Sequence, residues 1–462
     1  MLHSRSIAAI ALPASVASRL GDMIVVAAVA PFAALSRFNL KRLFLGVILF
    51  EMPLQLDTYL AYREEIADMG GIGGFNLAVT TGCLVALGLI WAFELALGME
   101  RAAGGWVRRC WPAAFYVLVV AGSIAFAHDR LLAIFELNLL LQTLALFVYL
   151  VTTTRSFDDV RFVMTMLLIG LVIQGIIMIA LSITGETVTI LTVRMSVING
   201  GRAAGTMGSP NAAGGYLSIL LAPALAVAVL WRGKALRLLA WCGVVLGLVA
   251  LVLTASRGAW IASATSLTLF WLLIWRRGLV SLKAPLALGG LGLLTLVPFM
   301  DQIMMRIFGD DGGAAYSRIP LMKLAMSMVG DNPFWGVGAN NFAYAMPYYV
   351  SLDIAGSWLF TVHNKYLLVW TETGTVGLVA FMVFLGSILL NSRRGWLGDH
   401  PFLPPLSMAV GAAVTGQMLH MFFDLFNGRA NVQILWIVGA LVAAIASLEV
   451  AARANPASLR AK

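Results

Sequence analysis

The sequence predicts an all-α membrane protein, a polytopic bundle of transmembrane helices, and three observations support this. The 462 residues are 60% hydrophobic and only 11% charged, with a mean hydropathy of +0.90, whereas about a quarter of a water-soluble globule is charged. Apolar runs of about 20 residues, the length that crosses a bilayer as a helix, recur along the chain. Lysines and arginines gather in short clusters between these runs. Because backbone in lipid must satisfy its own hydrogen bonds, the runs are expected to be helices.

About twelve of the runs are predicted to be core transmembrane helices. Their spans are 43–60, 75–98, 113–127, 131–153, 162–184, 214–231, 236–254, 259–275, 284–300, 363–391, 401–423 and 430–451. A further apolar stretch precedes them, and it is interpreted as retained rather than as a cleaved signal peptide, because more apolar sequence follows at once. This stretch forms either one extra span or a hairpin of two short ones.

The basic clusters predict the orientation. When the spans alternate, the clusters fall on one side, which the positive-inside bias assigns to the cytoplasm together with the C-terminus. The net charge of +9 therefore fits short cytoplasmic turns better than a groove for nucleic acid, and no nucleic-acid partner is expected. Three longer segments fall on the outer side, at 56–74, 185–212 and 301–362.

Four regions follow from this pattern. Residues 1–42 form the N-terminal apolar segment, residues 43–300 hold transmembrane helices with outer loops, residues 301–362 form a large helical outer segment, and residues 363–462 hold the last transmembrane helices and the tail.

His363 is the first candidate for chemistry. Of five histidines, it alone stands at the outer mouth of a predicted span beside the largest outer segment. Histidine is the side chain best suited to accept a proton near neutral pH. The alternative is an interfacial histidine that caps a helix.

Three outer arginines are the second set of candidates. Arg257 interrupts a hydrophobic hairpin at its outer turn, Arg318 precedes a predicted amphipathic helix in the large segment, and Arg202 lies in a glycine-rich loop. Arginine suits bidentate recognition of phosphate. The alternatives are an arginine that reaches for lipid headgroups and ordinary solvated side chains.

No metal site is predicted. The outer segments contain no DxD pair, and the chain has neither an HExxH motif nor a CxxC pair among its three cysteines. Transferases that depend on Mg²⁺ or Mn²⁺ and zinc enzymes need such ligands.

Four motifs carry a resemblance to a known family. They are "GTMGSPNAAGGYL" (205–217), "TASRGAW" (254–260), "SRIPLMKLAMSMVGDNPFWGVGANNFAYAMPYY" (317–349) and "VHNKYLLVWTETGTVGLVAF" (362–381). Together they resemble the O-antigen ligase and polymerase superfamily, whose pattern combines an SRG-like turn, an arginine that opens an outer helix, a GvG turn and an HN-x-y-L helix.

The resemblance implies a GT-C-like bundle in the bacterial inner membrane with an active site facing the periplasm. It implies metal-independent, inverting transfer of a glycan from undecaprenyl diphosphate, without a cofactor. The acceptor is lipid A–core in ligases, a second lipid-linked chain in polymerases, or a protein in protein-glycosylating relatives. His363 would be the general base, and Arg257 and Arg318, with Arg202 as a weaker candidate, would bind the diphosphate.

Neighbouring polar residues are secondary candidates for the site. Asn364 would share the catalytic rim with His363, Lys365 would contact an anionic headgroup or phosphate, and Tyr366, Asn340 and Asn341 belong to the same motifs. Glu372 follows His363 by nine residues, which is about 180° around a helix. It is therefore expected to pair with a neighbouring span, and its role is left open.

We favour a ligase, with a polymerase as the alternative, because the shared motifs do not separate the two. A transporter or flippase of a lipid-linked sugar is the alternative from another class. The sequence has no evident inverted repeat and no recurring mid-membrane charges, both of which are typical of transporters.

Overall fold

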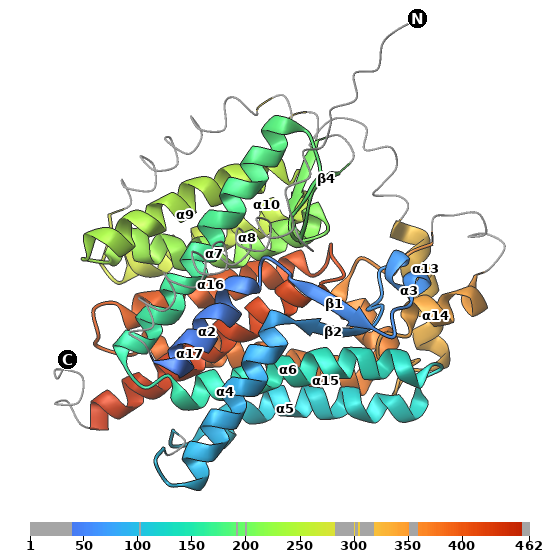
Figure 1. Cartoon of the computed structure of the whole chain (residues 1–462), viewed down its shortest axis with the longest axis horizontal. Helices are drawn as coiled ribbons and strands as arrows, with labels where there is room; N and C mark the ends of the chain where they lie inside the picture. The colour runs from blue at the N-terminus through green and yellow to red at the C-terminus, as the bar shows by residue number, and fades with distance from the viewer. Residues whose placement is uncertain are drawn as a thin grey trace, which may run out of the picture.

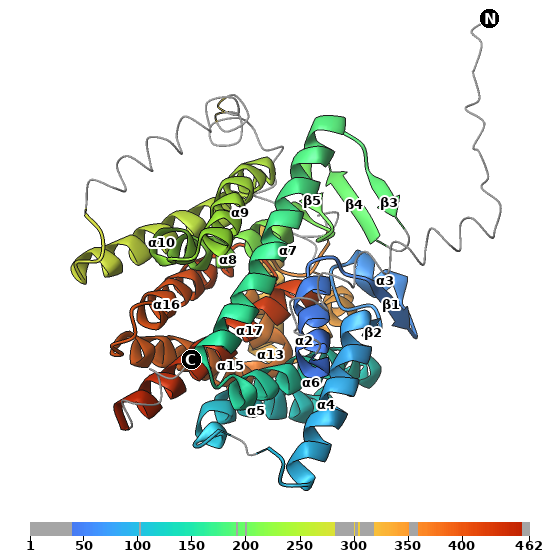
Figure 2. The same ribbon diagram turned by 60° about the vertical axis from the view of Figure 1, so that its left-hand side comes forward.

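The computed structural model describes residues 39–100, 103–190, 193–198, 201–281, 300, 304, 318–350 and 359–454. Long helices lie alongside one another in a bundle, with small sheets and short helices toward one end (Figures 1 and 2). The longer helices are α2 (Leu40–Glu51), α4 (Val79–Ala96), α5 (Trp106–Ser123), α6 (Arg130–Thr153), α7 (Phe157–Thr184), α8 (Pro210–Leu230), α9 (Lys234–Leu253), α10 (Arg257–Arg276), α13 (Arg318–Asp331), α15 (Lys365–Trp396), α16 (Leu403–His420) and α17 (Arg429–Ala454). Short helices are α3 (Glu64–Asp68), α14 (Phe342–Ala345), η1 (Ile124–Phe126) and η3 (Met346–Tyr349).

The chain is a polytopic helical membrane protein. In the described ranges, nine helices are long and apolar enough to cross a membrane, and of these α8 and α17 are the most deeply buried. The predicted run 401–423 forms the 18-residue helix α16, which packs against α10, α8 and α15. Residues 284–299 of the predicted span 284–300 and the N-terminal segment before residue 39 lie outside the described residues.

The predicted span 43–60 is wrong. Helix α2 ends at Glu51, Pro53 follows, and residues 57–60 form the strand β1 (Asp57–Leu60), which pairs antiparallel with β2 (Phe75–Ala78). Proline lacks the N–H that a helix interior needs, so the helix ends before it. The apolar run is therefore divided between a short helix and a strand.

The expectation of an all-α fold is corrected by these strands and by a second sheet. Strands β3 (Val188–Ile190), β4 (Val193–Ile198) and β5 (Arg202–Gly205) form an antiparallel sheet in the order β3-β4-β5. The segment is rich in valine, isoleucine and threonine, whose branched side chains favour strands. This second sheet lies in the predicted outer segment 185–212, whereas β2 occupies the first residues of the predicted span 75–98.

The turns gather at two ends of the bundle, as the alternation of spans predicts. At one end, the Phe157 ring lies 5.3 Å from that of Trp231 and 4.7 Å from that of His400, and the Trp231 ring lies 4.9 Å from that of Phe402. These contacts join the turns before α7, after α8 and before α16. Because Lys41 and Arg42 lie at this end of the bundle, we call it the basic end, and we call the opposite end the His363 end.

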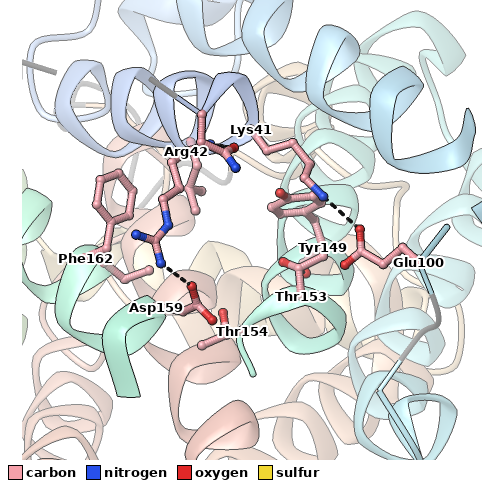
Figure 3. Close-up of a pocket in the computed structure, with 11 residues that line it drawn as sticks. Lys41, Arg42, Glu100, Tyr149, Thr153, Thr154, Asp159 and Phe162 are labelled. Atoms are coloured by element: carbon pink, nitrogen blue, oxygen red, sulfur yellow. Dashed lines mark hydrogen bonds and ion pairs between the residues drawn. The ribbon is translucent and has the colours of Figure 1, made fainter. Parts of the chain in front are cut away.

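A cavity of about 450 Å³ at the basic end is framed by ion pairs (Figure 3). Lys41 binds Glu94 and Glu100 at 2.7 and 2.9 Å. Arg42 binds Asp159 at 2.8 Å and also pairs with Asp158. Lys41 and Arg42 thus fasten the start of α2 to α4, to the turn after it and to the first turn of α7.

Candidate active site

His363 lies at the mouth of α15, where hydrogen bonds hold the chain against the end of α16. The Asn364 side chain caps α15 by accepting from the Leu367 N–H at 3.1 Å. The Lys365 N–H donates to the Met421 carbonyl at 2.8 Å, and the Tyr366 hydroxyl donates to the Met418 carbonyl at 2.8 Å. His363 is therefore fixed between two helices rather than placed on a loose loop.

Arg318 reaches the same place from a different element. It opens α13, and its guanidinium donates to the Phe423 carbonyl, 3.3 Å away, in the turn that follows α16. Burial, together with the nearby charge of Arg318, lowers the pKa of His363 to about 4, against the opposing influence of the Asp424 carboxylate. At neutral pH the His363 imidazole is consequently neutral and able to accept a proton.

Arg257 opens α10, which packs closely on this turn. A Cβ atom added to the adjacent Gly258 would lie 3.0 Å from His420 Cδ2 and 3.2 Å from Phe423 Cβ. The absence of a side chain at Gly258 permits this approach. The first turn of α10, which begins with Arg257, thus lies beside the turn 421–424, to which Arg318 is hydrogen-bonded and next to which the chain at His363 is held.

Arg202 joins the strand β5 to the start of α10. Its Nε donates to the Thr254 carbonyl at 3.0 Å, and its Nη2 donates to Asn211 Oδ1 at 3.2 Å. Thr254 stands three residues before Arg257. These bonds therefore place Arg202 beside residues 254–257, which we call the arginine turn, and they position the backbone of that turn.

His420 and Asp424 belong to the same surroundings and were not predicted as site residues. His420 is 1% exposed and hydrogen-bonds Gln417 at 3.2 Å, and Gln417 in turn bonds Ser218 at 3.1 Å. Asp424 is 5% exposed. The sequence offered one indication of these two residues. A histidine lies in the last turn of a predicted span at the same end of the bundle as His363, and an aspartate follows it four residues later.

Asn340 and Asn341 have structural contacts that occupy their amide groups. Asn340 accepts from the Ile72 N–H at 2.7 Å and donates to the carbonyls of Ile72 and Leu132. Asn341 accepts from the Asp129 N–H at 2.6 Å and donates to the Asp129 carbonyl at 3.0 Å. Both asparagines bind the large outer segment to the turns before α4 and α6.

The interpretation of Lys365 as a ligand for a lipid headgroup is corrected by its burial. Lys365 is 5% exposed and lines an internal cavity with Glu136 and Glu372. A cation surrounded by two buried carboxylates inside the bundle does not face headgroups. Tyr366 is half-buried, with its ring against those of Phe381 and Phe422.

The expectation that Glu372 pairs with a neighbouring span is also wrong. Its Oε1 accepts from the Phe342 N–H at 3.1 Å, at the start of α14. The carbonyls of Thr371 and Glu372 accept from the N–H groups of Val337 and Gly338 at 3.0 and 2.9 Å. The "GVG" turn is thereby hydrogen-bonded to α15.

This docking is possible because α15 is interrupted. Gly374 has φ 65° and ψ −171°, a conformation outside the helix, and a Cβ atom there would overlap the Phe334 carbonyl group. The Thr375 N–H donates to the Pro333 carbonyl at 2.8 Å. The outer loop 333–338 therefore inserts into a break in a membrane helix.

Among the residues that the structure describes, no three His, Cys, Asp or Glu side chains are grouped so that they could hold a metal ion. The sequence "GDDGG" (309–313), whose two aspartates are expected to form a flexible acidic turn rather than a cation site, lies outside those residues.

A comparison with models of protein families finds a match in the middle of the chain. Residues 242–382 match the family model described as O-antigen ligase. This segment belongs to the O-antigen ligase and polymerase superfamily. A search of curated proteins found no match.

The O-antigen ligase segment begins in α9 and ends in α15, and it contains Arg257, Arg318 and His363. Arg202, His420 and Asp424 lie outside it. Strand β5 and helix α16 bring these three residues to the ligase segment, so the candidate site is assembled from more of the chain than the matched residues.

Proposed function

We propose that the chain is a glycosyltransferase of the O-antigen ligase type, which moves a glycan from undecaprenyl diphosphate to lipid A–core at the periplasmic face of the inner membrane. The observation that supports this proposal is that Arg318, the start of α10 at Arg257 and a neutral His363 all lie beside one turn, 421–424. All three lie in the segment that matches the O-antigen ligase family.

In the proposed reaction His363 is the general base. A neutral imidazole takes the proton of the acceptor hydroxyl as its oxygen attacks the anomeric carbon of the donor sugar. The bond between that carbon and the diphosphate oxygen breaks on the opposite face, so the configuration inverts. The diphosphate leaves with the electron pair of the broken bond, still attached to its lipid.

Arg257 and Arg318 stabilise the leaving group in this proposal. Negative charge builds on the diphosphate as the bond breaks, and fixed cations at that point lower the barrier because they need no reorganisation. Two guanidinium groups can also bind phosphate oxygens in pairs. This arrangement does the work that a divalent metal does in other transferases, and chelators are therefore expected to leave transfer intact.

The acceptor separates this proposal from its alternatives. Purified protein is given one defined lipid-linked glycan together with either lipid A–core or a second lipid-linked chain. A ligase extends lipid A–core, whereas a polymerase lengthens the lipid-linked chain. A transporter of lipid-linked sugar would move the donor across a vesicle membrane and transfer nothing, which would overturn the proposal.

A further inference from the structure

A polar groove separates the strand β1 from the sheet that holds Arg202. The groove has a volume of about 560 Å³, and the residues used below are Gln55, Asp57, Tyr59, Arg194, Ser196 and Thr206. Small-molecule sites in proteins have volumes of about 300–1,000 Å³. We call it the β1–β4 groove; Figure 2 shows where the strands β1 and β4 lie.

The floor of the groove is fixed before any ligand binds. Gln55 Nε2 donates to the Thr206 carbonyl at 2.9 Å, which ties the chain before β1 to the chain after β5. Gln55 has φ 54°, an uncommon value for a residue other than glycine. Asp57 is held by Arg429 at 2.6 Å and by the Asn76 amide at 3.0 Å. A preformed floor reduces the entropy lost on binding.

The walls carry groups that suit a sugar chain. Tyr59 is 41% exposed and lies beside the ring of Tyr62, at 5.6 Å between centroids. Arg194 is exposed, and its side chain makes no hydrogen bond or ion pair with any residue in the described ranges. Tyrosine faces pack against the apolar faces of sugar rings, while an arginine donates to hydroxyl and carboxylate oxygens.

The charge of the groove favours a neutral or acidic ligand. The Asp57 carboxylate is already paired with the buried guanidinium of Arg429, which also binds Glu51 at 2.8 Å. Arg194 is therefore the cation that a ligand would meet at the surface of the wall. A cationic ligand would find no partner there that is not already bound.

The sheet connects one wall of the groove to Arg202. Strand β4 pairs with β5, with Ile198 opposite Arg202. Arg202 is bonded to Thr254 and Asn211 beside the arginine turn of α10. The groove and the arginine turn are therefore joined by hydrogen bonds through β4, β5 and Arg202.

We infer that the β1–β4 groove binds the sugar chain of the lipid-linked donor, through stacking on Tyr59 and hydrogen bonds to Arg194. The inference rests on the proposed function for the identity of the ligand, but the groove can be tested without any transfer reaction.

The test measures binding of the lipid-free repeat-unit oligosaccharide from the strain that carries the chain. Full-length protein in nanodiscs, with His363→Ala to prevent turnover, is titrated while saturation-transfer NMR reports on the sugar protons. Tyr59→Ala and Arg194→Ala should each weaken binding about fivefold or more, the effect of losing one hydrogen bond or ring contact. Leu60→Ala is the matched control, because Leu60 is exposed on the same strand and does not line the groove.

Equal affinity in Tyr59→Ala, Arg194→Ala and the control would overturn the inference. Selective loss of bound phosphatidylglycerol from Arg194→Ala in native mass spectrometry, with glycan binding unchanged, would instead assign the groove to a lipid headgroup and overturn it as well. If the variants lose the oligosaccharide but the enzyme transfers no glycan, the groove stands and the proposed function fails.

Discussion

At the scale of the residue, the protonation of His363 depends on its burial and on two charged neighbours. Burial and Arg318 favour the neutral imidazole, and Asp424 favours the charged one. Because a general base must be unprotonated before it acts, the proposed reaction makes these residues determine the lowest pH at which transfer occurs.

The pH dependence of transfer should reflect this balance. A pKa of about 4 for His363 keeps its imidazole neutral at pH values well below about 6.5, the ordinary pKa of histidine. Activity should thus persist through pH 6 and fall only as the pH approaches 4. The measurement is kcat/KM against pH for the full-length enzyme.

Two variants test the assignment of this acid limb. Arg318→Ala removes a nearby cation and should move the limb to higher pH, whereas Asp424→Asn removes an anion and should move it to lower pH. Identical limbs in all three proteins would show that another group titrates, whatever the loss in maximal rate.

The sequence predicts some of these residues and not others, for a physical reason. His363 and Arg257 are polar residues at the ends of apolar runs, and Arg318 opens an amphipathic helix. Polar and charged side chains are rare at such positions, so a reader of the sequence notices them. His420 ends α16 and Asp424 lies in the turn after it, both beyond the family match, and the packing of α16 on α10, which is close at Gly258, brings them to the arginine turn. Asn340 and Asn341 belong to the same motif as the site, yet their amides bind the backbone.

At the scale of the element, the motif around Glu372 and Gly374 is a docking site for a loop. The glycine gives α15 a break, and the loop 333–338 fills it with backbone hydrogen bonds to Thr371, Glu372 and Thr375. Since α13 precedes this loop and α15 follows His363, the break fixes the distance between Arg318 and the base.

Gly374→Ala should therefore destabilise the protein by at least about 1–3 kcal/mol, because a residue with a Cβ atom is strained at this φ and collides with Phe334. The midpoint of thermal unfolding in detergent measures this. Gly386→Ala is the control in the same helix, where an added Cβ has nothing within 4 Å, and it should leave the midpoint unchanged or raise it. Equal midpoints for the two variants would contradict the account of the loop.

Element type was less predictable where one apolar run contains two structures. Residues 43–60 have the length and hydropathy of a span, but Glu51 near their middle is 1% exposed and bound to Arg429. Arg429 is 378 residues away in the chain. Periodicity and composition are local properties, so they cannot reveal such a partner.

At the scale of the whole molecule, Arg429 joins the first described helix and strand to the last helix of the chain. It binds Glu51 of α2 and Asp57 of β1, while Thr80 of α4 donates to the same Glu51. The Arg429 and Glu51 side chains are 3% and 1% exposed. The helix α17 is thereby fastened to α2, α4 and the wall of the β1–β4 groove.

Arg429→Met should lower the free energy of unfolding by about 3–5 kcal/mol, because it leaves two buried carboxylates without their cation. Arg161→Ala, which breaks an exposed ion pair with Asp158, should change it by less than about 1 kcal/mol. Denaturant titration in micelles compares the two. A similarly small change in the free energy of unfolding of both variants would mean that the buried ion pairs of Arg429 do not hold α17 to α2 and β1.

The most direct test of the central claim is single-turnover transfer by His363→Ala, with purified lipid-linked donor and lipid A–core in chelator-containing buffer. His128→Ala, a histidine before α6 at the same end of the bundle, is the control. Loss of a general base lowers rates by about 10²–10⁴-fold, so His363→Ala should lose at least about 100-fold while remaining folded and in the membrane, and His128→Ala should transfer normally. Transfer by His363→Ala at the rate of the unmodified enzyme would contradict the account.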